Sequence, residues 1–369
     1  MHSKLTTLVA LFVVAATVPF GAAATPPADA TAEVSTPQSL ATNAQEDCSL
    51  PVTRTDATGT EVTVEESPER IVAVGGSTPQ VFWELGLQDR VVGMPVAGYT
   101  SYLNGSEEKT DVLTEDGSVD QEQVVALQPD LVVLANIYPN QTAQSLRAAG
   151  LTVYKEDFPS SLDGVRSTVD TYGTLTGECA AAEETNTAFD ESVQRIRNAT
   201  ESEESPRVFF YFFNFTAGSG TFTDELITTA GGTNAAAEGG IEGFRQVNLE
   251  VVAEQDPQVV VVPDQSSVPS GEPWNSTTAY EEGNVVRVDT NLVQQPAPRV
   301  VQPLGVMQAA FASAIEEETA TATTTPTATA EGTDRQTPEA DSSGDGAGFG
   351  VTGALVAALA AALLVGRRD

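Results

Sequence analysis

Two stretches of the chain repeat one pattern of hydrophobic and polar positions. In each stretch an acidic residue, Glu122 or Glu250, opens a short amphipathic turn, and a proline follows seven residues later. An all-apolar run comes soon after, at residues 131–134 and 259–262. Continuous apolar runs of this length are typical of strands buried on both faces of a parallel sheet. The repeat predicts two similar α/β lobes, the alternative being ordinary α/β patterning without a repeat.

A second, looser match supports the two lobes. Residues 69–93 and residues 205–232 both run through a strand, a loop, a helix and a glycine stop. We therefore place an N-terminal α/β lobe at residues 48–160 and a C-terminal α/β lobe at residues 206–316. The fold class that this predicts is α/β, with two Rossmann-like lobes.

Residues 161–205 connect the lobes and have helical periodicity. Apolar residues recur at helical spacing over residues 162–172, after which Gly173 and Gly177 are expected to interrupt the helix. A second helix is predicted at about residues 178–198, and a helix of this size spans roughly 30 Å. That length suits a strut that bridges the two lobes.

Both ends of the chain are hydrophobic. Residues 1–24 join a basic start, a short apolar run and small residues, which predicts a secretory signal peptide rather than a membrane anchor. Residues 348–369 contain an uncharged run just long enough to cross a bilayer core, followed by two arginines. Because basic residues stay on the cytoplasmic side, this tail predicts a body anchored on the extracellular face of the membrane, unless the run is a buried core helix.

Two segments between these ends and the lobes have little to bury. Residues 25–47 are expected to form a flexible spacer. Residues 317–347 are rich in Thr, Ala, Pro, Gly and acidic residues, which predicts a disordered stalk. Five glycosylation sequons agree with an exported glycoprotein. Their asparagines are Asn104, Asn140, Asn198, Asn214 and Asn275.

The charge is strongly negative. The chain has 52 acidic and 17 basic residues, a formal net charge of −35. An acidic excess of this size argues against nucleic acid as a partner. It indicates a halophilic protein, because high salt screens the repulsion between like charges. The alternative is an acidic surface that binds cations.

Cysteine and histidine usage narrows the chemistry. The two cysteines, Cys48 and Cys179, are predicted to form one disulfide in an exported chain, although two separate buried thiols are the alternative. The one histidine is His2, inside the predicted signal peptide. The mature chain therefore lacks the residue that Ser-His-Asp and Cys-His catalysis and histidine-ligated metal sites require. We expect no enzyme and no resident cofactor or metal, with carboxylate acid–base catalysis as the remaining alternative.

Two open α/β lobes leave a crevice between the carboxyl ends of their strands, where ligands bind as a rule. Candidate ligand-binding residues lie in the predicted strand-end loops. They combine aromatic rings, amides and two arginines, which suits a large, flat, partly polar ligand rather than a bare metal ion. These residues are Ser77, Tyr99, Tyr102, Asn136, Tyr138, Asn214, Phe215, Phe244, Arg245, Asp289 and Arg299.

The chain resembles the ABC-transporter solute-binding proteins for cobalamin and iron-siderophores, the class III periplasmic-binding family. The resemblance covers nearly all of residues 60–316 in order. The segments that carry it are residues 69–93, 119–135, 146–165, 220–240, 244–262 and 287–301. It implies two lobes joined by a rigid helix, and one glutamate on each lobe that meets arginines of an ABC permease. The matching positions are Glu122 and Glu250, whose alternative role is to complement a helix dipole.

The resemblance also implies a ligand. The protein is expected to deliver a corrinoid to an ABC importer, and the paired tyrosines of residues 98–106 favour this ligand. One alternative is an iron(III)-siderophore, so the cobalt or iron would belong to the ligand. Another is a cell-surface structural or adhesion protein without a transport role. The tail resembles an archaeal sorting signal, with Ala347 in place of its proline, which implies processing and lipid attachment.

Overall fold

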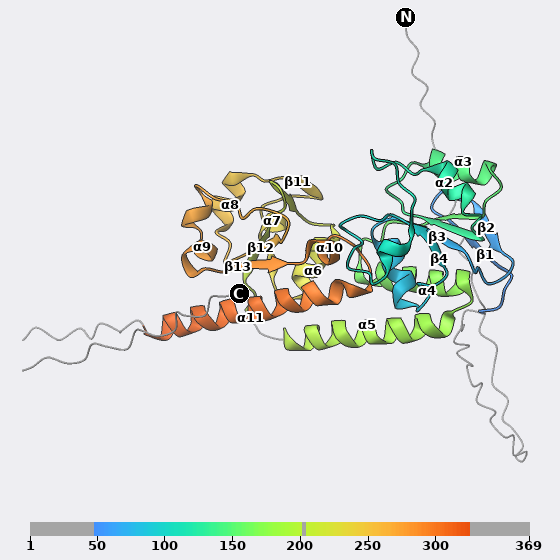
Figure 1. The fold of residues 1–369 in the computed structure, drawn as a ribbon. Helices are drawn as coiled ribbons and strands as arrows, with labels where there is room; N and C mark the ends of the chain where they lie inside the picture. Colours follow the sequence, from blue (N-terminus) through green and yellow to red (C-terminus); the bar gives the residue numbers. More distant parts are fainter. Residues whose placement is uncertain (1–47, 201–203, 325–369) are drawn as a thin grey trace, which may run out of the picture.

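The structure is a computed structural model that describes residues 48–200 and 204–324 (Figure 1). The predicted signal peptide, spacer and C-terminal hydrophobic tail lie outside the described residues, as do residues 325–347 of the predicted stalk. Residues 317–324, which were predicted to be disordered, are instead the last residues of the helix α11 (Val301–Thr324). None of the helices in residues 48–200 and 204–324 has both the length and the hydrophobicity that spanning a bilayer requires.

The N-terminal lobe is built on a five-stranded sheet whose neighbouring strands are all parallel. The strand order is β5-β4-β3-β6-β7. The strands are β3 (Ile71–Val74), β4 (Val91–Met94), β5 (Thr110–Asp111), β6 (Leu131–Leu134) and β7 (Val153–Lys155). The other elements of this lobe are β1 (Val52–Thr55), β2 (Glu61–Val64), α1 (Ser77–Glu84), η1 (Ser106–Glu108), α2 (Gln121–Ala126) and α3 (Asn140–Ala148).

The C-terminal lobe has a four-stranded parallel sheet in the order β10-β8-β12-β13. Its strands are β8 (Arg207–Phe210), β10 (Thr233–Asn234), β12 (Val259–Pro263) and β13 (Val285–Val288). A separate antiparallel ribbon consists of β9 (Phe215–Ala217) and β11 (Phe244–Gln246). The helices are α6 (Phe222–Thr229), α7 (Ala235–Glu238), α8 (Leu249–Gln255), η2 (Trp274–Ser276), α9 (Thr278–Glu282), α10 (Thr290–Val293), η3 (Pro298–Val300) and α11 (Val301–Thr324).

The prediction of two α/β lobes is confirmed, and the sequence repeat is a structural repeat. In the first copy α2 leads through Pro129 to β6, and in the second α8 leads through Pro257 to β12. The residue before each proline is left-handed, with φ 49° at Gln128 and 39° at Asp256. Such a residue ends a helix, and the proline after it cannot continue one.

Two helices, α4 (Leu162–Thr176) and α5 (Cys179–Ala199), lie between the sheets in sequence, and α5 extends from below the N-terminal lobe toward the C-terminal lobe, alongside α11 (Figure 1). α4 starts in the C-terminal core with Leu162 and ends in the N-terminal core with Leu175. α5 returns in the opposite sense, from Ala182 in the N-terminal core to Phe189 and Val193 in the C-terminal core. Each helix therefore packs into both lobes.

The expectation that Gly173 interrupts the first bridging helix is wrong, because Gly173 lies inside α4. A Cβ atom at this position would lie 2.5 Å from the Cβ of Ala182 in α5. The glycine thus lets two helices approach more closely than a side chain would permit. Gly177 does end the helix, with φ 77° at its C-cap, a conformation that glycine adopts without strain.

Each sheet is covered on both faces by hydrophobic residues. In β3, Ile71 and Ala73 pack on the side of α1 and α4, whereas Val72 and Val74 pack on the side of α2 and α3. β12 divides its valines in the same way between α6 and α11 on one face and α7 and α8 on the other. Burial on both faces explains why these strands are apolar throughout.

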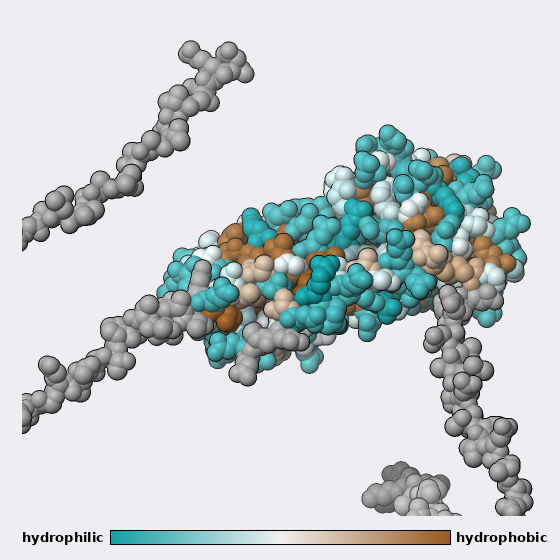
Figure 2. Space-filling view, turned by 90° about the horizontal axis from the view of Figure 1, so that it is seen from below, coloured by the Kyte–Doolittle hydropathy of each residue, from teal (hydrophilic) through white to brown (hydrophobic). Residues whose placement is uncertain are grey.

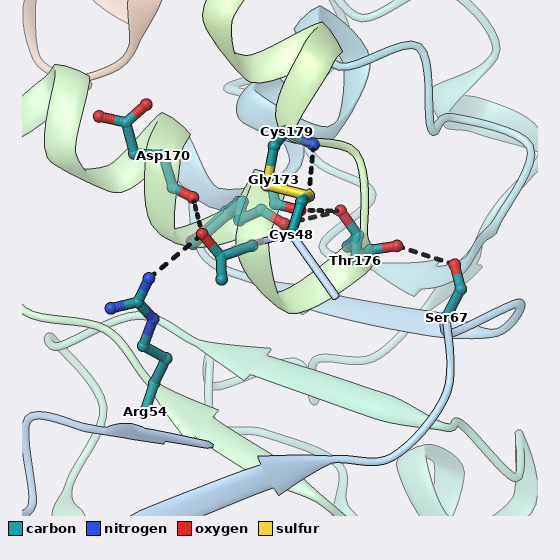
Figure 3. Close-up of a disulfide and its surroundings, with 9 residues drawn as sticks. Cys48, Arg54, Ser67, Asp170, Gly173, Thr176 and Cys179 are labelled. Carbon is teal, nitrogen blue, oxygen red and sulfur yellow. Dashed lines mark hydrogen bonds between the residues drawn. A yellow bond between two sulfur atoms is a disulfide. The ribbon is translucent and has the colours of Figure 1, made fainter. Parts of the chain in front are cut away.

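The predicted disulfide is confirmed. Cys48 and Cys179 are bonded, with their Cα atoms 5.9 Å apart, and the backbone N–H of Cys179 donates to Sγ of Cys48 at 3.1 Å. The bond fixes the start of the N-terminal lobe to the first residue of α5 (Figure 3). Ser67 donates to the carbonyl of Thr176 at 2.8 Å, so the turn between α4 and α5 is held by a second contact.

Candidate ligand-binding cleft

Both parallel sheets reverse their strand order at one point, between β3 and β6 in the N-terminal lobe and between β8 and β12 in the C-terminal lobe. In open parallel sheets, ligands bind outside the carboxyl ends of the strands at such a point. The loops after these four strands are therefore the candidate site.

A pocket of about 650 Å³ opens at this point of the N-terminal lobe. It is lined by Gly76 after β3, Tyr99 after β4, and Ile137 and Tyr138 after β6. The side chain of Ile137 is 71% exposed, although isoleucine is among the residues most often buried. The pocket thus offers aromatic and aliphatic surface that the protein itself does not cover.

Two tyrosines give this pocket its polar groups. Burial raises the pKa of Tyr99 above its usual value, and the nearby carboxylate of Asp111 raises it further. Burial raises the pKa of Tyr138 to about 12, with contributions from Tyr99 and Asp111. Both phenols therefore stay protonated at physiological pH and can donate hydrogen bonds to carbonyl or amide oxygens of a ligand.

Three phenylalanines, which we call the phenylalanine edge, lie at the matching part of the C-terminal lobe. Phe213, Phe215 and Phe244 are 55%, 51% and 51% exposed. In the β9–β11 ribbon, Phe215 pairs with Gln246 and Phe244 pairs with Ala217. Phe215 and Phe244 therefore share one face of the ribbon as diagonal neighbours.

Phe213 occupies a strained turn. Its φ is 46° and that of Asn214 is 67°, in the left-handed region that bulky residues avoid. The backbone N–H of Phe213 donates to Oγ of Ser266 at 3.0 Å, which ties the loop after β8 to the loop after β12. Strain of this kind collects at binding sites, where the direction of one side chain matters.

Arg245 follows Phe244 in β11 and so starts from the face of the ribbon opposite to Phe215 and Phe244. It pairs with Thr216 in the β9–β11 ribbon, is exposed, and its Nη1 donates to the carbonyl oxygen of Phe244 at 2.9 Å. The guanidinium can present further N–H donors to a carbonyl or phosphate oxygen.

Two predicted ligand residues, Tyr102 and Arg299, lie in the contact between the lobes. The hydroxyl of Tyr102 accepts a hydrogen bond from Gln80 Nε2 at 2.7 Å and donates to Gln295 Oε1 at 2.9 Å. Arg299 Nε lies 2.6 Å from Glu84 Oε1, and the guanidinium lies 5.7 Å from the centre of the Tyr102 ring. Burial raises the pKa of Tyr102 to about 12, so its hydroxyl keeps its proton.

The other predicted ligand residues lie at strand ends with varied surroundings. Ser77 is the first residue of α1. Asn136 is exposed and is the second residue after β6. Asn214 is exposed in the strained turn. Asp289 caps α10, where its carboxylate accepts N–H hydrogen bonds from that helix at 2.8 and 3.3 Å.

Sequence reasoning did not single out Phe213, Ile137 or Gln295. Phe213 and Ile137 are each the third residue after a buried strand, β8 and β6 respectively, which is a signal that the sequence holds. Their exposure is not visible in the sequence, because a phenylalanine inside the aromatic run 209–213 reads as core.

The two glutamates of the repeat are both exposed. Glu122 lies in the first turn of α2 and Glu250 in the first turn of α8. α2 and α8 lie on one side of the molecule, and α5 and α11 lie on the other (Figure 1). Seen from the α5 and α11 side, the visible surface is mostly hydrophilic, with hydrophobic residues in separate groups (Figure 2).

A metal centre is not found in the described part of the chain. Within it, no group of three or more His, Cys, Asp or Glu side chains is arranged to hold a metal ion. The residues at the candidate cleft are aromatic, amide and arginine side chains, which fit an organic ligand.

Comparison with known proteins gives consistent matches. Residues 71–292 match the family described as periplasmic binding protein. The chain is 39% identical over 291 residues to the cobalamin-binding protein of Halobacterium salinarum, covering 74% of this chain and 78% of that protein. It is 26% identical to the vitamin B12-binding protein of Yersinia pestis, over 53% of this chain and 70% of that protein. The solved structure of the periplasmic heme-binding protein RhuT from Roseiflexus aligns at 25% identity with a TM-score of 0.59, over 67% of this chain and 98% of that chain.

Proposed function

The chain belongs to the family of periplasmic binding proteins, whose members bind solutes rather than catalyse reactions, and we propose that it captures a corrinoid outside the cytoplasm for delivery to an ABC importer. The observation that supports a corrinoid as the ligand is the 39% identity over 291 residues to a cobalamin-binding protein. The expectation that the chain is not an enzyme agrees with the family.

The geometry of the two lobes supports a corrinoid. Such a ligand is a broad macrocycle with an apolar face, amide side chains and, in its complete form, one phosphodiester. Tyr99 and Tyr138 offer ring faces and neutral hydroxyl donors, and the phenylalanine edge offers further apolar surface. Arg245 supplies a cation for the phosphodiester.

An iron(III)-siderophore is the alternative ligand. A catecholate siderophore complex carries several negative charges, and its capture would require several cations. The N-terminal pocket instead includes Asp116 in its lining and has Asp111 close to both tyrosines. A carboxylate near the ligand raises the free energy of a polyanionic complex, so the charges favour the corrinoid.

Ligand identity can be tested directly. Purified protein incubated separately with cyanocobalamin, a ferric siderophore or hemin should retain the corrinoid absorbance after desalting. Tyr99→Ala and Tyr138→Ala should each weaken cyanocobalamin binding by at least tenfold, or about 1.4 kcal/mol. Val306→Ala, an exposed apolar residue on α11, serves as the control and should leave the affinity unchanged. Retention of a siderophore or of hemin, with no corrinoid, would reverse the proposal.

The remaining organisation follows the family resemblance. Residues 48–160 and 206–316 act as the two binding lobes, and the bridging helices of residues 161–205 keep their relative movement small. Glu122 and Glu250 meet arginines of the permease. Residues 348–369 hold the protein at the extracellular face of the membrane, so the captured ligand stays close to the importer.

A further inference from the structure

A short segment of the C-terminal lobe crosses to the N-terminal lobe and returns. Residues 294–300 connect α10 to α11 and include two buried prolines. Val293 before the segment and Val300 at its end pack in the C-terminal core, whereas Ala297 between them packs in the N-terminal core. The crossing is therefore fixed by packing as well as by polar contacts.

Four hydrogen bonds, which we call the inter-lobe relay, run through this crossing. The backbone N–H of Arg299 donates to Gln80 Oε1 at 2.8 Å, and Gln80 Nε2 donates to the Tyr102 hydroxyl at 2.7 Å. The hydroxyl donates to Gln295 Oε1 at 2.9 Å, and Gln295 Nε2 donates to the backbone carbonyl of Tyr99 at 2.9 Å. Every side chain in the relay donates once and accepts once, which fixes the orientation of both amides.

Gln295 ends the relay at the wall of the N-terminal pocket. Its side chain is 8% exposed, and a Cβ added to Gly76 would lie only 3.2 Å from its Cδ atom. Gly76 and Tyr99 both line the pocket. One side chain of the C-terminal lobe therefore contacts the pocket wall of the other lobe at two places.

We infer that Gln295 is a positioning residue that holds the Tyr99 loop, residues 95–105, in the conformation that binds ligand. The inference rests on the proposed function, because it takes Tyr99 as a ligand contact. Gln295 acts through the carbonyl of Tyr99 and needs no ligand contact of its own. A lobe movement that displaces the crossing segment would free this carbonyl, loosen the Tyr99 loop and so help release the ligand.

The substitution Gln295→Glu removes the hydrogen bond that residue 295 donates to Tyr99 while keeping a side chain of nearly the same size and shape. The ionised carboxylate still accepts from Tyr102 but cannot donate to Tyr99, and it places negative charge against a carbonyl oxygen. Burial against the Tyr99 carbonyl oxygen disfavours the ionised form and so raises the pKa of the introduced carboxyl. When protonated, the same side chain has one donor and one acceptor and restores the relay. We expect cyanocobalamin affinity about tenfold below wild type at pH 8, or about 1.4 kcal/mol, and recovery at pH 5.

The wild-type pH profile corrects for pH effects that do not involve residue 295. The charged groups around Tyr102 are Arg299, Asp289 and Glu84. Equal affinity of variant and wild type at pH 8, or a loss that persists at pH 5, would overturn the inference.

A second readout needs no ligand. Trp83 Nε1 donates to the carbonyl of Asn104 in the Tyr99 loop at 3.0 Å, and the chain has two tryptophans. In a Trp274→Phe background, Trp83 emission reports on this loop. Gln295→Glu should increase the quenching of Trp83 fluorescence by acrylamide at pH 8. At pH 5 the quenching should equal that of the Trp274→Phe protein that retains Gln295. Unchanged quenching would contradict the inference even if the protein bound no corrinoid and the proposed function failed.

Gln302→Glu is the matched control. Gln302 is an exposed glutamine in the first turn of α11, and the substitution introduces the same charge close to the crossing segment. It should leave both the affinity and the quenching unchanged at each pH. If it reproduced the effect of Gln295→Glu, the cause would be the added charge and the positioning role would be ruled out.

Discussion

At the residue scale, Glu156 is a buried carboxyl group that the binding function does not use. It follows β7 and accepts hydrogen bonds from the hydroxyls of Thr78 in α1, at 3.0 Å, and Tyr172 in α4. Burial raises its pKa from the usual 4.5 to about 7, and the two hydrogen bonds oppose this shift only in part. The carboxyl group therefore titrates near neutral pH while it joins a strand to two helices.

This shift predicts how stability depends on pH. Between about pH 4.5 and pH 7 the folded state binds the proton more tightly than the unfolded state, so the free energy of unfolding should fall as the pH rises through this window. The effect is on the order of 3 kcal/mol at most. Glu156→Gln should flatten the profile, measured by guanidinium unfolding at constant ionic strength from pH 5 to pH 8. Glu183→Gln, an exposed site on α5, should leave the slope as in wild type, and an equal slope in Glu156→Gln would count against this account.

At the element scale, the α4–α5 pair determines how the two lobes are joined. Each helix contributes side chains to both cores, so neither lobe can rotate without disturbing packed residues. Gly173 is the point of close approach, where Ala182 of α5 occupies the space of a missing Cβ. By contrast, apart from its chain neighbours and its own helix backbone, Gly305 in α11 has no atom within 4 Å of the place where its Cβ would be.

The two glycines predict opposite effects of one substitution. Gly173→Ala should lower the free energy of unfolding by about 1–3 kcal/mol, because the added methyl group forces α4 and α5 apart. Gly305→Ala should raise it by about 0.5–1 kcal/mol, because alanine restricts the unfolded chain and fits the helix. Guanidinium unfolding midpoints measure both. A similar shift in both variants would show that helix propensity, rather than the α4–α5 contact, decides the outcome.

At the scale of the whole molecule, different helices form two opposite sides of the protein. On one side lie α2 and α8, each of which has an exposed glutamate in its first turn. On the other side lie α5 and α11 (Figure 1). Glu122 and Glu250 occupy equivalent positions in the repeat, so a partner with matching pseudo-symmetry can meet both at once. The candidate ligand residues are on other elements, namely the strand-end loops, the first residue of α1, η3 and the β9–β11 ribbon.

This separation predicts that transport and binding can be uncoupled. The double charge reversal Glu122→Arg with Glu250→Arg should abolish corrinoid uptake by cells and leave the affinity of the purified protein for cyanocobalamin unchanged. The matched control reverses two exposed glutamates of α5, Glu183→Arg with Glu191→Arg, and should retain uptake. Weaker corrinoid binding in the first variant, or equal loss of uptake in the control, would refute permease contact at these two sites.

The sequence by itself determined the elements whose signal is local. The apolar runs at residues 131–134 and 259–262 predicted buried parallel strands, and both are strands. A strand without polar residues is stable where other elements cover both faces of its sheet. The repeat predicted the two lobes because the same local pattern of helix, proline and apolar strand occurs twice along the chain. The pair Cys48 and Cys179 could be predicted because an exported chain offered no other partner.

Only the tertiary structure decided which strand-end residues remain available to a ligand. Tyr102 and Gln295 are 193 residues apart in sequence, and no local pattern reveals that the crossing segment brings them together. The same holds for Gly173, whose place inside a helix depends on Ala182 of another helix, and for the exposure of Phe213. Periodicity is a property of neighbours along the chain, whereas these outcomes depend on which distant surfaces pack against each other.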